Sequence, residues 1–175
     1  MTFKVAIGLA AFAGLRRSEV IGLRWSDVDL KGNVITVRRA ITRGEETTPK
    51  SGKPRPIPIA QPLLVMLEAS AMSKKSPWAP VAVTGAGKLW REYGLNQSLK
   101  RVQKRAGRSR ASFHDLRHFF ITELFRKGVS APVVQQLAGH ADLATTQRYV
   151  DMVASDLTAT IAAFSLPGRV GPEGV

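Results

Sequence analysis

Residues 114–149 begin with His114-Asp-Leu-Arg117-His118, continue through Gly139-His140 and end with Thr145-Thr146-Gln-Arg148-Tyr149. They hold all three histidines of the chain and one of its two tyrosines. Arg117 follows His114 by three positions, so the two side chains share a face if this segment is helical. Cationic groups bind phosphate, and a tyrosine hydroxyl can attack a bound phosphate. The stretch therefore predicts a phosphate site with Tyr149 as its nucleophile, to which the upstream chain should add further groups.

The composition indicates one domain that binds polyanions. The chain has 175 residues, 44% of them hydrophobic, and a formal net charge of +13. Such a charge attracts nucleic acid, although a ribosome-like or simply basic protein fits it as well. The chain contains no cysteine, which excludes disulfides and thiolate metal sites and fits a reducing, cytoplasmic setting.

The positive charge is unevenly distributed. Lys and Arg minus Asp and Glu gives +5 over residues 1–73, +9 over 74–110 and −1 over 112–175. We therefore expect the middle segment to be the main contact with polyanions. The segment that holds the candidate nucleophile has few charges at specific spacings, which suits a site better than a general binding surface.

The amino-terminal residues 3–15 are almost all apolar. A lysine followed by a short apolar run also fits a secretory signal, but arginines follow at once and the run is too short to span a membrane. We predict a buried helix that ends at Gly14, then a helix capped by Ser18 that runs to Leu23. Arg16 would lie between the two helix ends and point at an anion; the alternative is a solvated surface arginine.

Residues 27–59 predict a small antiparallel sheet. A hairpin turns at residues 31–33, and its second strand runs from Val34 towards Ala40. Residues 42–53 read as a polar loop, a mobile hairpin tip that carries Lys50 and Lys53. Residues 55–59 read as a third strand, at an edge because its two prolines lack ladder donors.

The rest of the chain reads as helices, so the fold class is α+β, mainly helical with a three-stranded antiparallel sheet. We expect helices over residues 61–70, 88–105, 116–127 and from Ser130 to Gly139, a turn that carries Tyr149, and an amphipathic helix over 155–164. Residues 166–175 read as a flexible tail. A face of phosphate-contacting cations is expected from Lys100, Arg101, Lys104, Arg105, Arg108 and Arg110, with Lys74 and Lys75 in the preceding loop.

These motifs resemble, in order and spacing, the catalytic domain of tyrosine recombinases, which include phage integrases and Xer-type recombinases. The matching residues begin with Gly14-Leu-Arg16-Arg-Ser-Glu19, include Lys50 and continue through the three motifs quoted at the outset. The resemblance covers nearly the whole chain, with residues 1–165 as the catalytic domain. It implies a metal-independent, cofactor-free enzyme that cleaves and rejoins double-stranded DNA through a 3′-phosphotyrosyl intermediate.

The resemblance also implies a role for each matching residue. Arg16 and Arg117 would clamp the scissile phosphate, His114 and His140 would flank it, and Tyr149 would be the nucleophile. Lys50 would protonate the departing 5′-oxygen, with Lys53 as the nearby rival and a DNA contact. Glu19 would support the arginine region, while Asp115 and His118 would orient and pack.

The chemistry agrees with these roles independently of the family. Negative charge grows on the non-bridging phosphate oxygens during attack, and two planar guanidinium groups can bind those oxygens. A phenol with a reference pKa of about 10 needs a proton acceptor, which a neutral imidazole provides. An alkoxide is a poor leaving group, so a general acid such as a lysine must reach its oxygen.

The chain departs from the family pattern in three respects. Ala138 stands where Leu commonly precedes the Gly-His pair, and Asp151 stands where a His often follows the nucleophile. The family's amino-terminal DNA-clamping domain is expected before Met1 and is absent from this chain.

By resemblance, the partners would be DNA, three further copies in a tetramer on DNA that exchanges strands through a Holliday junction, and accessory DNA-bending proteins. The free protein would be a monomer that does not contact a membrane. Its location would be cytoplasmic and nucleoid-associated.

Other functions fit part of the pattern. Residues 116–150 could form a helix-turn-helix that binds DNA without chemistry, but this leaves Arg16, Lys50 and His114 unexplained. A degenerate recombinase that binds without cutting and a type IB-like topoisomerase remain open. A nucleotide-binding enzyme is disfavoured because the chain lacks a Gly-rich phosphate loop.

Overall fold

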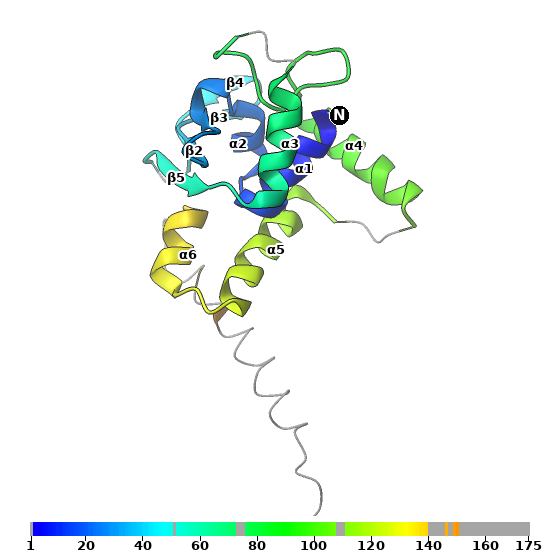
Figure 1. Cartoon of the computed structure of the whole chain (residues 1–175). Coiled ribbons are helices and arrows are strands. Elements are labelled where there is room, and N and C mark those ends of the chain that lie inside the picture. The colour runs from blue at the N-terminus through cyan, green and yellow to red at the C-terminus, as the bar shows by residue number, and fades with distance from the viewer. Residues whose placement is uncertain are drawn as a thin grey trace, which may run out of the picture.

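The computed structural model describes residues 2–50, 52–72, 76–107 and 111–139, together with 146, 149 and 150. The described chain is mainly helical with short antiparallel strands (Figure 1), which confirms the predicted α+β class. The predicted helix over 155–164, the tail over 166–175, His140 and four predicted DNA-contacting residues lie outside the described residues: Lys74, Lys75, Arg108 and Arg110.

Helix α1 (Thr2–Ala13) is the centre of the core, as its apolar sequence predicts. It packs against α3 (Gln61–Ala71) and α5 (Phe113–Arg126). Gly14 ends α1 with φ +63°, and a Cβ there would lie 2.3 Å from the ring of Phe120 on α5. The glycine therefore allows both the left-handed turn and the close approach of α5 to the end of α1.

Helix α2 (Arg17–Gly22) begins one residue before the predicted cap, so the assignment of Ser18 as N-cap is wrong. The residue at the cap position is Arg16, whose backbone N–H donates to the Glu19 carboxylate at 2.8 Å. Glu19 thus closes the first turn of α2 from the third position, which removes the need for a hydroxyl cap. Arg16 lies between α1 and α2, as predicted.

The three-stranded sheet has the order β1 (Val28–Asp29), β2 (Val34–Val37), β5 (Arg55–Pro58), all antiparallel, as predicted. Ile35 of β2 pairs with Val28 on one side and with Ile57 on the other. The buried side chains alternate along β2 and β5, which places Arg55 on the same inward face as Ile57.

A second hairpin, β3 (Ala40–Thr42) and β4 (Glu45–Thr47), lies where we predicted a continuing strand and then a loop. The strand breaks between Val37 and Ala40 because Arg38 and Arg39 both turn to the buried carboxylate of Asp27, the last residue of the short helix η1 (Trp25–Asp27). In a continuous strand, consecutive side chains point to opposite faces of the sheet. Arg38 and Arg39 both point towards Asp27, so the strand cannot continue through them.

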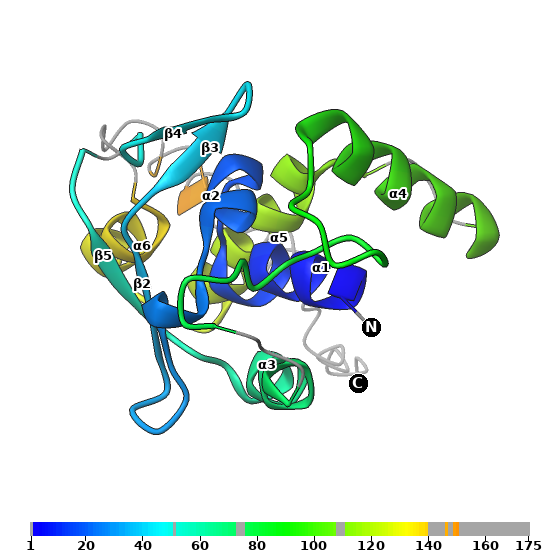
Figure 2. The same ribbon diagram turned by 90° about the horizontal axis from the view of Figure 1, so that it is seen from above.

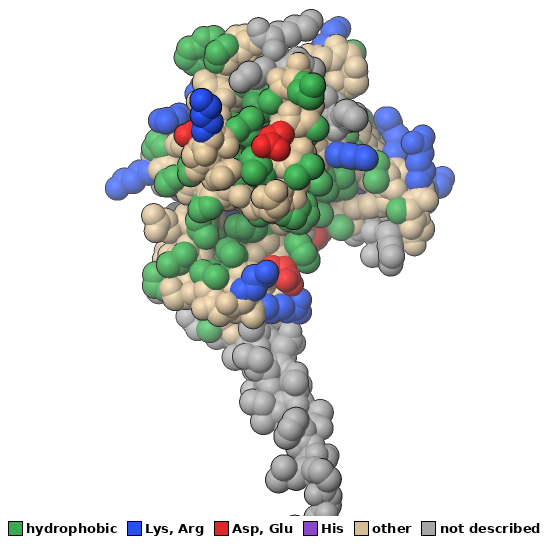
Figure 3. Space-filling view, viewed as in Figure 1, with side chains coloured by type: hydrophobic (Ala, Val, Ile, Leu, Met, Phe, Trp, Pro, Cys, Tyr) green, Lys and Arg blue, Asp and Glu red, His purple; other side chains and the backbone are tan. Residues whose placement is uncertain are grey.

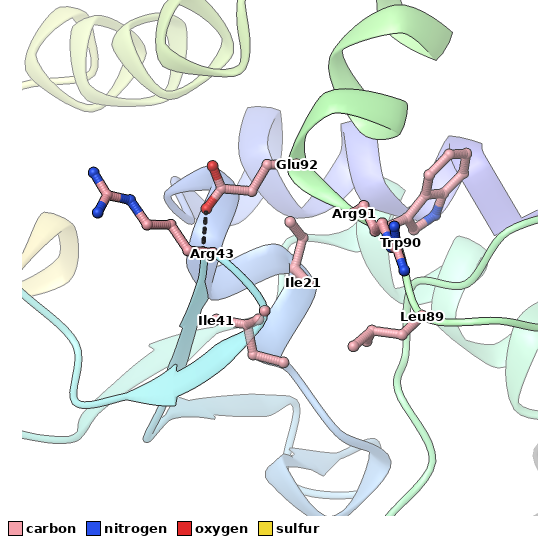
Figure 4. A pocket seen from close by; sticks show the side chains of 8 residues that line it. Ile21, Ile41, Arg43, Leu89, Trp90, Arg91 and Glu92 are labelled. Atoms are coloured by element: carbon pink, nitrogen blue, oxygen red, sulfur yellow. Dashed lines mark hydrogen bonds between the residues drawn. The ribbon is translucent and has the colours of Figure 1, made fainter.

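Helix α4 (Glu92–Arg105) begins four residues later than predicted. The backbone N–H of Thr84 donates to the Lys88 carbonyl, and the backbone N–H of Lys88 donates to the Thr84 hydroxyl. Val83 also pairs with Leu89, so this segment turns before the helix starts. Glu92 accepts a hydrogen bond from Arg17 at 2.8 Å and one from the backbone of Arg43 at 3.4 Å. It joins α4 to α2 and to the β3–β4 hairpin beside a cavity of about 530 Å³ (Figure 4).

Helices α5 and α6 (Ala131–Ala138) lie together at one end of the molecule (Figure 1), with α6 beside β5 in Figure 2. Helix α5 begins at Phe113, three residues earlier than predicted, because Ser112 accepts from the backbone of His114 and Asp115. Gly139 ends α6 with φ +65°, as the sequence predicts. Tyr149 packs in a small apolar cluster with Ile121 and Ala138.

Within the described residues, no helix is long and apolar enough to cross a membrane. That same part of the chain contains no group of three His, Cys, Asp or Glu residues that could hold a metal ion.

Candidate active site

The two predicted phosphate-binding arginines meet at the carboxyl end of α6. Arg16 donates from Nη2 to the carbonyl of Gly139 at 2.8 Å. Arg117 donates from Nη2 to the carbonyl of Ala138 at 2.6 Å and from Nη1 to that of Gly14 at 2.5 Å. The folded chain therefore brings together side chains that are about a hundred residues apart, through the negative end of a helix dipole.

Glu19 lies beside this pair and is buried. Its carboxylate accepts from Arg16 Nη1 at 3.0 Å and from two nitrogens of Arg55, at 2.9 and 2.7 Å. Burial alone would raise the pKa of Glu19, but the hydrogen bonds and positive charges of Arg55 and Arg16 hold that pKa below its usual value. Glu19 is thus ionised at neutral pH and pairs with both Arg16 and Arg55.

Arg117 is 2% exposed, whereas 22% of the Arg16 side chain reaches solvent. Burial, and then the positive charge of Arg16, lowers the pKa of Arg117 to about 9. The guanidinium remains protonated at neutral pH, and its two carbonyl partners replace the water it has lost. The site consequently holds concentrated positive charge on rigid elements before any ligand enters.

Tyr149 lies against α5, and its hydroxyl is hydrogen-bonded to Nδ1 of His118. The phenol ring stacks on Phe125 at 6.4 Å between ring centres and is 8% exposed. Burial raises the pKa of Tyr149, while the charge of Arg117 opposes that rise. The candidate nucleophile is therefore protonated at neutral pH and lies within the electrostatic reach of Arg117.

His118 contacts the candidate nucleophile directly, whereas the resemblance implied that it would orient and pack. Burial and the neighbouring His114 lower the pKa of His118 below its usual 6.5, so the imidazole is neutral at pH 7 and can accept a proton. The rings of His114 and His118 meet edge to face, 4.2 Å apart. Among the described imidazoles, His118 is the one bonded to Tyr149, while His114 is exposed beside it.

Asp115 closes the first turn of α5. Its carboxylate accepts from the backbone and the hydroxyl of Ser112, both at 2.7 Å. These hydrogen bonds lower the pKa of Asp115. His114 projects from this first turn into a cavity of about 370 Å³ that Arg17 and Tyr93 also line.

The two lysine candidates lie in different surroundings. Lys50 is exposed in the turn that follows β4. Lys53 lines a cavity of about 400 Å³ together with Arg55 and Gly139, which places it beside the carboxyl end of α6. The fold thus brings the rival lysine to the edge of the arginine region, and the role of Lys50 stays a prediction.

Four of the cations expected to contact DNA lie on α4. The four described cations there are all exposed: Lys100, Arg101, Lys104 and Arg105. Blue side chains gather over this helix at the right of Figure 3, in the position that α4 has in Figure 1. Tyr93, the second residue of this helix, is 75% exposed and lines the same cavity as His114.

Arg55 was not among the predicted site residues. It is 4% exposed and bonds Glu19 and the carbonyl of Leu137 at 3.0 Å. The signal was the alternation of the third strand, because a residue two positions before Ile57 must share its inward face. A charged residue on an inward face is rarely buried without a partner, so this position could have been included.

Comparison with known proteins tests the resemblance to tyrosine recombinases. Residues 1–155 match the model of the phage integrase family. The chain belongs to that family. The resemblance stated from the motifs is therefore confirmed.

The curated relatives of this chain include recombinases. The chain is 30% identical over 156 residues to the tyrosine recombinase XerA of Pyrococcus furiosus, an alignment covering 87% of this chain and 51% of that protein. The crystal structure of XerA recombinase superposes with a TM-score of 0.73 at 24% identity, over 96% of this chain and 57% of the other. The Tn1549 transposon integrase in complex with a circular intermediate DNA has a TM-score of 0.73 at 21% identity, over 89% and 57%.

These similarities show the family and the fold. The chain spans about half the length of the curated relatives it matches: 51% of XerA of Pyrococcus furiosus and 53% of XerA of Pyrococcus horikoshii. The shared part contains the arginines, α5 and Tyr149, since it extends through residue 155.

Proposed function

We propose that this chain is the catalytic domain of a site-specific DNA recombinase that cuts and rejoins strands through a phosphotyrosyl bond. One observation carries the proposal: Arg16 and Arg117, from distant parts of the chain, bind adjacent carbonyls at the end of α6, within electrostatic reach of the Tyr149 phenol. Membership of the phage integrase family and the complex of Tn1549 integrase with DNA support DNA as the substrate.

In the proposed reaction the two guanidiniums bind the non-bridging oxygens of one DNA phosphate. The Tyr149 oxygen forms a bond to phosphorus, its proton passes to a neutral imidazole, and the bond from phosphorus to the 5′-oxygen breaks. The departing 5′-oxygen takes its proton from a lysine, Lys50 or Lys53. A 5′-hydroxyl of a second strand then attacks the phosphotyrosine and reverses the step, so the bond energy is conserved without ATP.

The arginines must expose donors for this to occur. Arg117 is buried and bonded to two carbonyls, while Arg16 keeps part of its guanidinium at the surface. We infer that phosphate first meets Arg16, because its guanidinium is the more accessible of the two. His140, which directly follows the glycine bound by Arg16, would complete the pocket from outside the described residues.

The assembly on DNA is likewise a proposal. Four copies would act in pairs on two duplexes, and an amino-terminal domain would complete the clamp around each site, as the length of the relatives suggests. A cytoplasmic, nucleoid-associated location follows from this substrate.

The proposal is tested by covalent capture. The purified chain is incubated with a library of duplexes that carry a randomised segment and a nick, so that the short strand beyond the cut diffuses away and the intermediate accumulates. We expect a band that survives detergent denaturation and disappears after protease digestion. Binding of the duplexes without any covalent product would instead identify a DNA-binding domain that does not cut.

The acid side of the pH profile should report on His118. We expect adduct formation to be constant near pH 7 and to fall about tenfold per pH unit once the pH drops below the pKa of His118, which lies under 6.5, because the protonated ring cannot accept the Tyr149 proton. His118→Gln, which does not titrate, should be slower and lose this decline. His114→Gln is the matched control and should keep the fall in adduct formation at acid pH. If His118→Gln also keeps that fall, His118 is not the group that accepts the proton.

Helix α4 should supply much of the salt dependence of DNA binding. Changing Lys100, Arg101, Lys104 and Arg105 to glutamine is expected to reduce the slope of log K against log salt by about 0.9 for each DNA phosphate that the variant no longer neutralises. Binding of a non-specific duplex by fluorescence anisotropy at several salt concentrations measures this slope. Arg126→Gln/Lys127→Gln, which removes two exposed cations at the far end of α5, is the control. An equal slope in both variants would place the DNA-binding surface elsewhere.

A further inference from the structure

Three successive carbonyls at the end of α6 are each bound by a different arginine. Arg55 Nε donates to Leu137 at 3.0 Å, Arg117 to Ala138 at 2.6 Å and Arg16 to Gly139 at 2.8 Å. These are carbonyls that a helix leaves without an intrahelical partner. Two of the three donors are the proposed phosphate ligands, whereas the motifs assign Arg55 no role.

Arg55 also controls Glu19, the anion that competes with DNA for Arg16. It binds both carboxylate oxygens of Glu19, at 2.9 and 2.7 Å, in the two-point geometry specific to guanidinium. Arg16 reaches the same carboxylate with one side-chain nitrogen, at 3.0 Å. Because Arg55 supplies two of the hydrogen bonds and a full positive charge, Glu19 orients Arg16 without neutralising it.

Gly139 is matched to Arg55 by shape. A Cβ at this position would lie 2.9 Å from Arg55 Nη1 and 3.0 Å from its Cδ and Cζ. The φ of +65° also favours glycine. The turn that leads directly into His140 is therefore packed against the Arg55 side chain and bonded to Arg16.

We propose that Arg55 is a positioning residue of the active site. It fixes Glu19 and the end of α6 in one arrangement, so that Arg16 points its remaining donors at the DNA phosphate. The inference rests on the proposed function, because it names a support for the phosphate-binding arginines of that reaction. Arg55 itself touches no reacting atom.

A lysine cannot replace Arg55 in this role. An ammonium group is a compact point charge, whereas the guanidinium binds two oxygens of Glu19 and the Leu137 carbonyl in one plane. Arg55→Lys keeps the charge and much of the volume but cannot form all three hydrogen bonds at once. It is therefore the variant that separates positioning from charge.

The first test compares binding with chemistry. In Arg55→Lys we expect the single-turnover rate of adduct formation on nicked DNA to fall about 100-fold, because small misplacements of reacting groups cause losses of that size. DNA affinity should change less than about threefold. Arg39→Lys is the matched control, because Arg39 also pairs with a buried carboxylate, Asp27, away from α6. Equal rates in the two variants, measured on equally folded samples, would overturn the proposal.

The second test does not need DNA cleavage. Inorganic phosphate is titrated into the wild-type chain and both variants while NMR follows the Nε–H signal of Arg16. We expect phosphate to shift that signal in the wild type and in Arg39→Lys. In Arg55→Lys we expect the dissociation constant for phosphate to be at least severalfold higher. The same phosphate affinity in all three proteins contradicts the positioning role. If the wild type binds phosphate and Arg55→Lys binds it more weakly, but the wild type forms no covalent adduct with DNA, the positioning role stands and only the proposed function is contradicted.

Discussion

Replacement of Tyr149 by phenylalanine is expected to abolish covalent capture of DNA and to leave DNA binding nearly unchanged. The substitution removes one oxygen atom, the proposed nucleophile, and no other group in the pocket can form the same phosphotyrosyl bond. The ring stays packed on Phe125 in the same cluster, so the fold should lose about 1 kcal/mol, the worth of the hydrogen bond to His118.

The assignment of Tyr149 can be checked directly because the chain contains two tyrosines. Nicked duplexes trap the adduct, nuclease digestion leaves a nucleotide on the protein, and mass spectrometry locates it. Tyr93→Phe is the matched control: Tyr93 is 75% exposed on α4 and should carry no nucleotide. Capture of DNA by Tyr149→Phe, or a modified Tyr93 in the wild type, would show that the nucleophile has been misassigned.

The second large effect is expected at Arg117. Arg117→Lys retains a cation but cannot bind the Ala138 carbonyl, the Gly14 carbonyl and a phosphate oxygen at once. We expect adduct formation to fall by roughly 10²–10³, which corresponds to about 3–4 kcal/mol of lost transition-state stabilisation. One buried carbonyl left without a donor should cost a further 1–3 kcal/mol, approximately, in the free energy of unfolding.

These two effects are separated by measuring both on the same samples. Urea denaturation gives the loss of stability, and single-turnover capture at a concentration where the variant is folded gives the rate. Arg126→Lys serves as the control, since Arg126 lies on the same helix but is exposed and paired with Glu123. A rate within threefold of wild type for Arg117→Lys would mean that Arg117 supports the fold rather than the phosphate.

Much of the site could be read from local patterns. The apolar run before Gly14 predicted that Arg16 follows a helix end, which is confirmed. The predicted helix over 116–127 left His114 out, whereas α5 includes both His114 and Arg117. Local patterns were less informative where distant groups decide the backbone. The second hairpin depends on Asp27, which pulls Arg38 and Arg39 out of the strand register.

The sequence also could not show which of two similar side chains forms a given hydrogen bond. Two imidazoles four residues apart on one helix look equivalent, yet burial and the position of Tyr149 make His118 its partner and leave His114 exposed. Arg55 was overlooked because a single arginine between prolines resembles a solvated edge residue. Its importance depends on Glu19, 36 positions away, and on Leu137, 82 positions away.

By itself the sequence determined the helices, the antiparallel sheet and the residue types of a phosphate site, because helix periodicity, strand alternation and glycine conformation act over a few neighbouring residues. The tertiary structure decided which arginines meet. It placed Arg16, Arg55 and Arg117 on three successive carbonyls of α6 and put one buried carboxylate between two of them. That arrangement arises because buried charges must find oppositely charged or polar partners, and in this chain those partners lie on other elements.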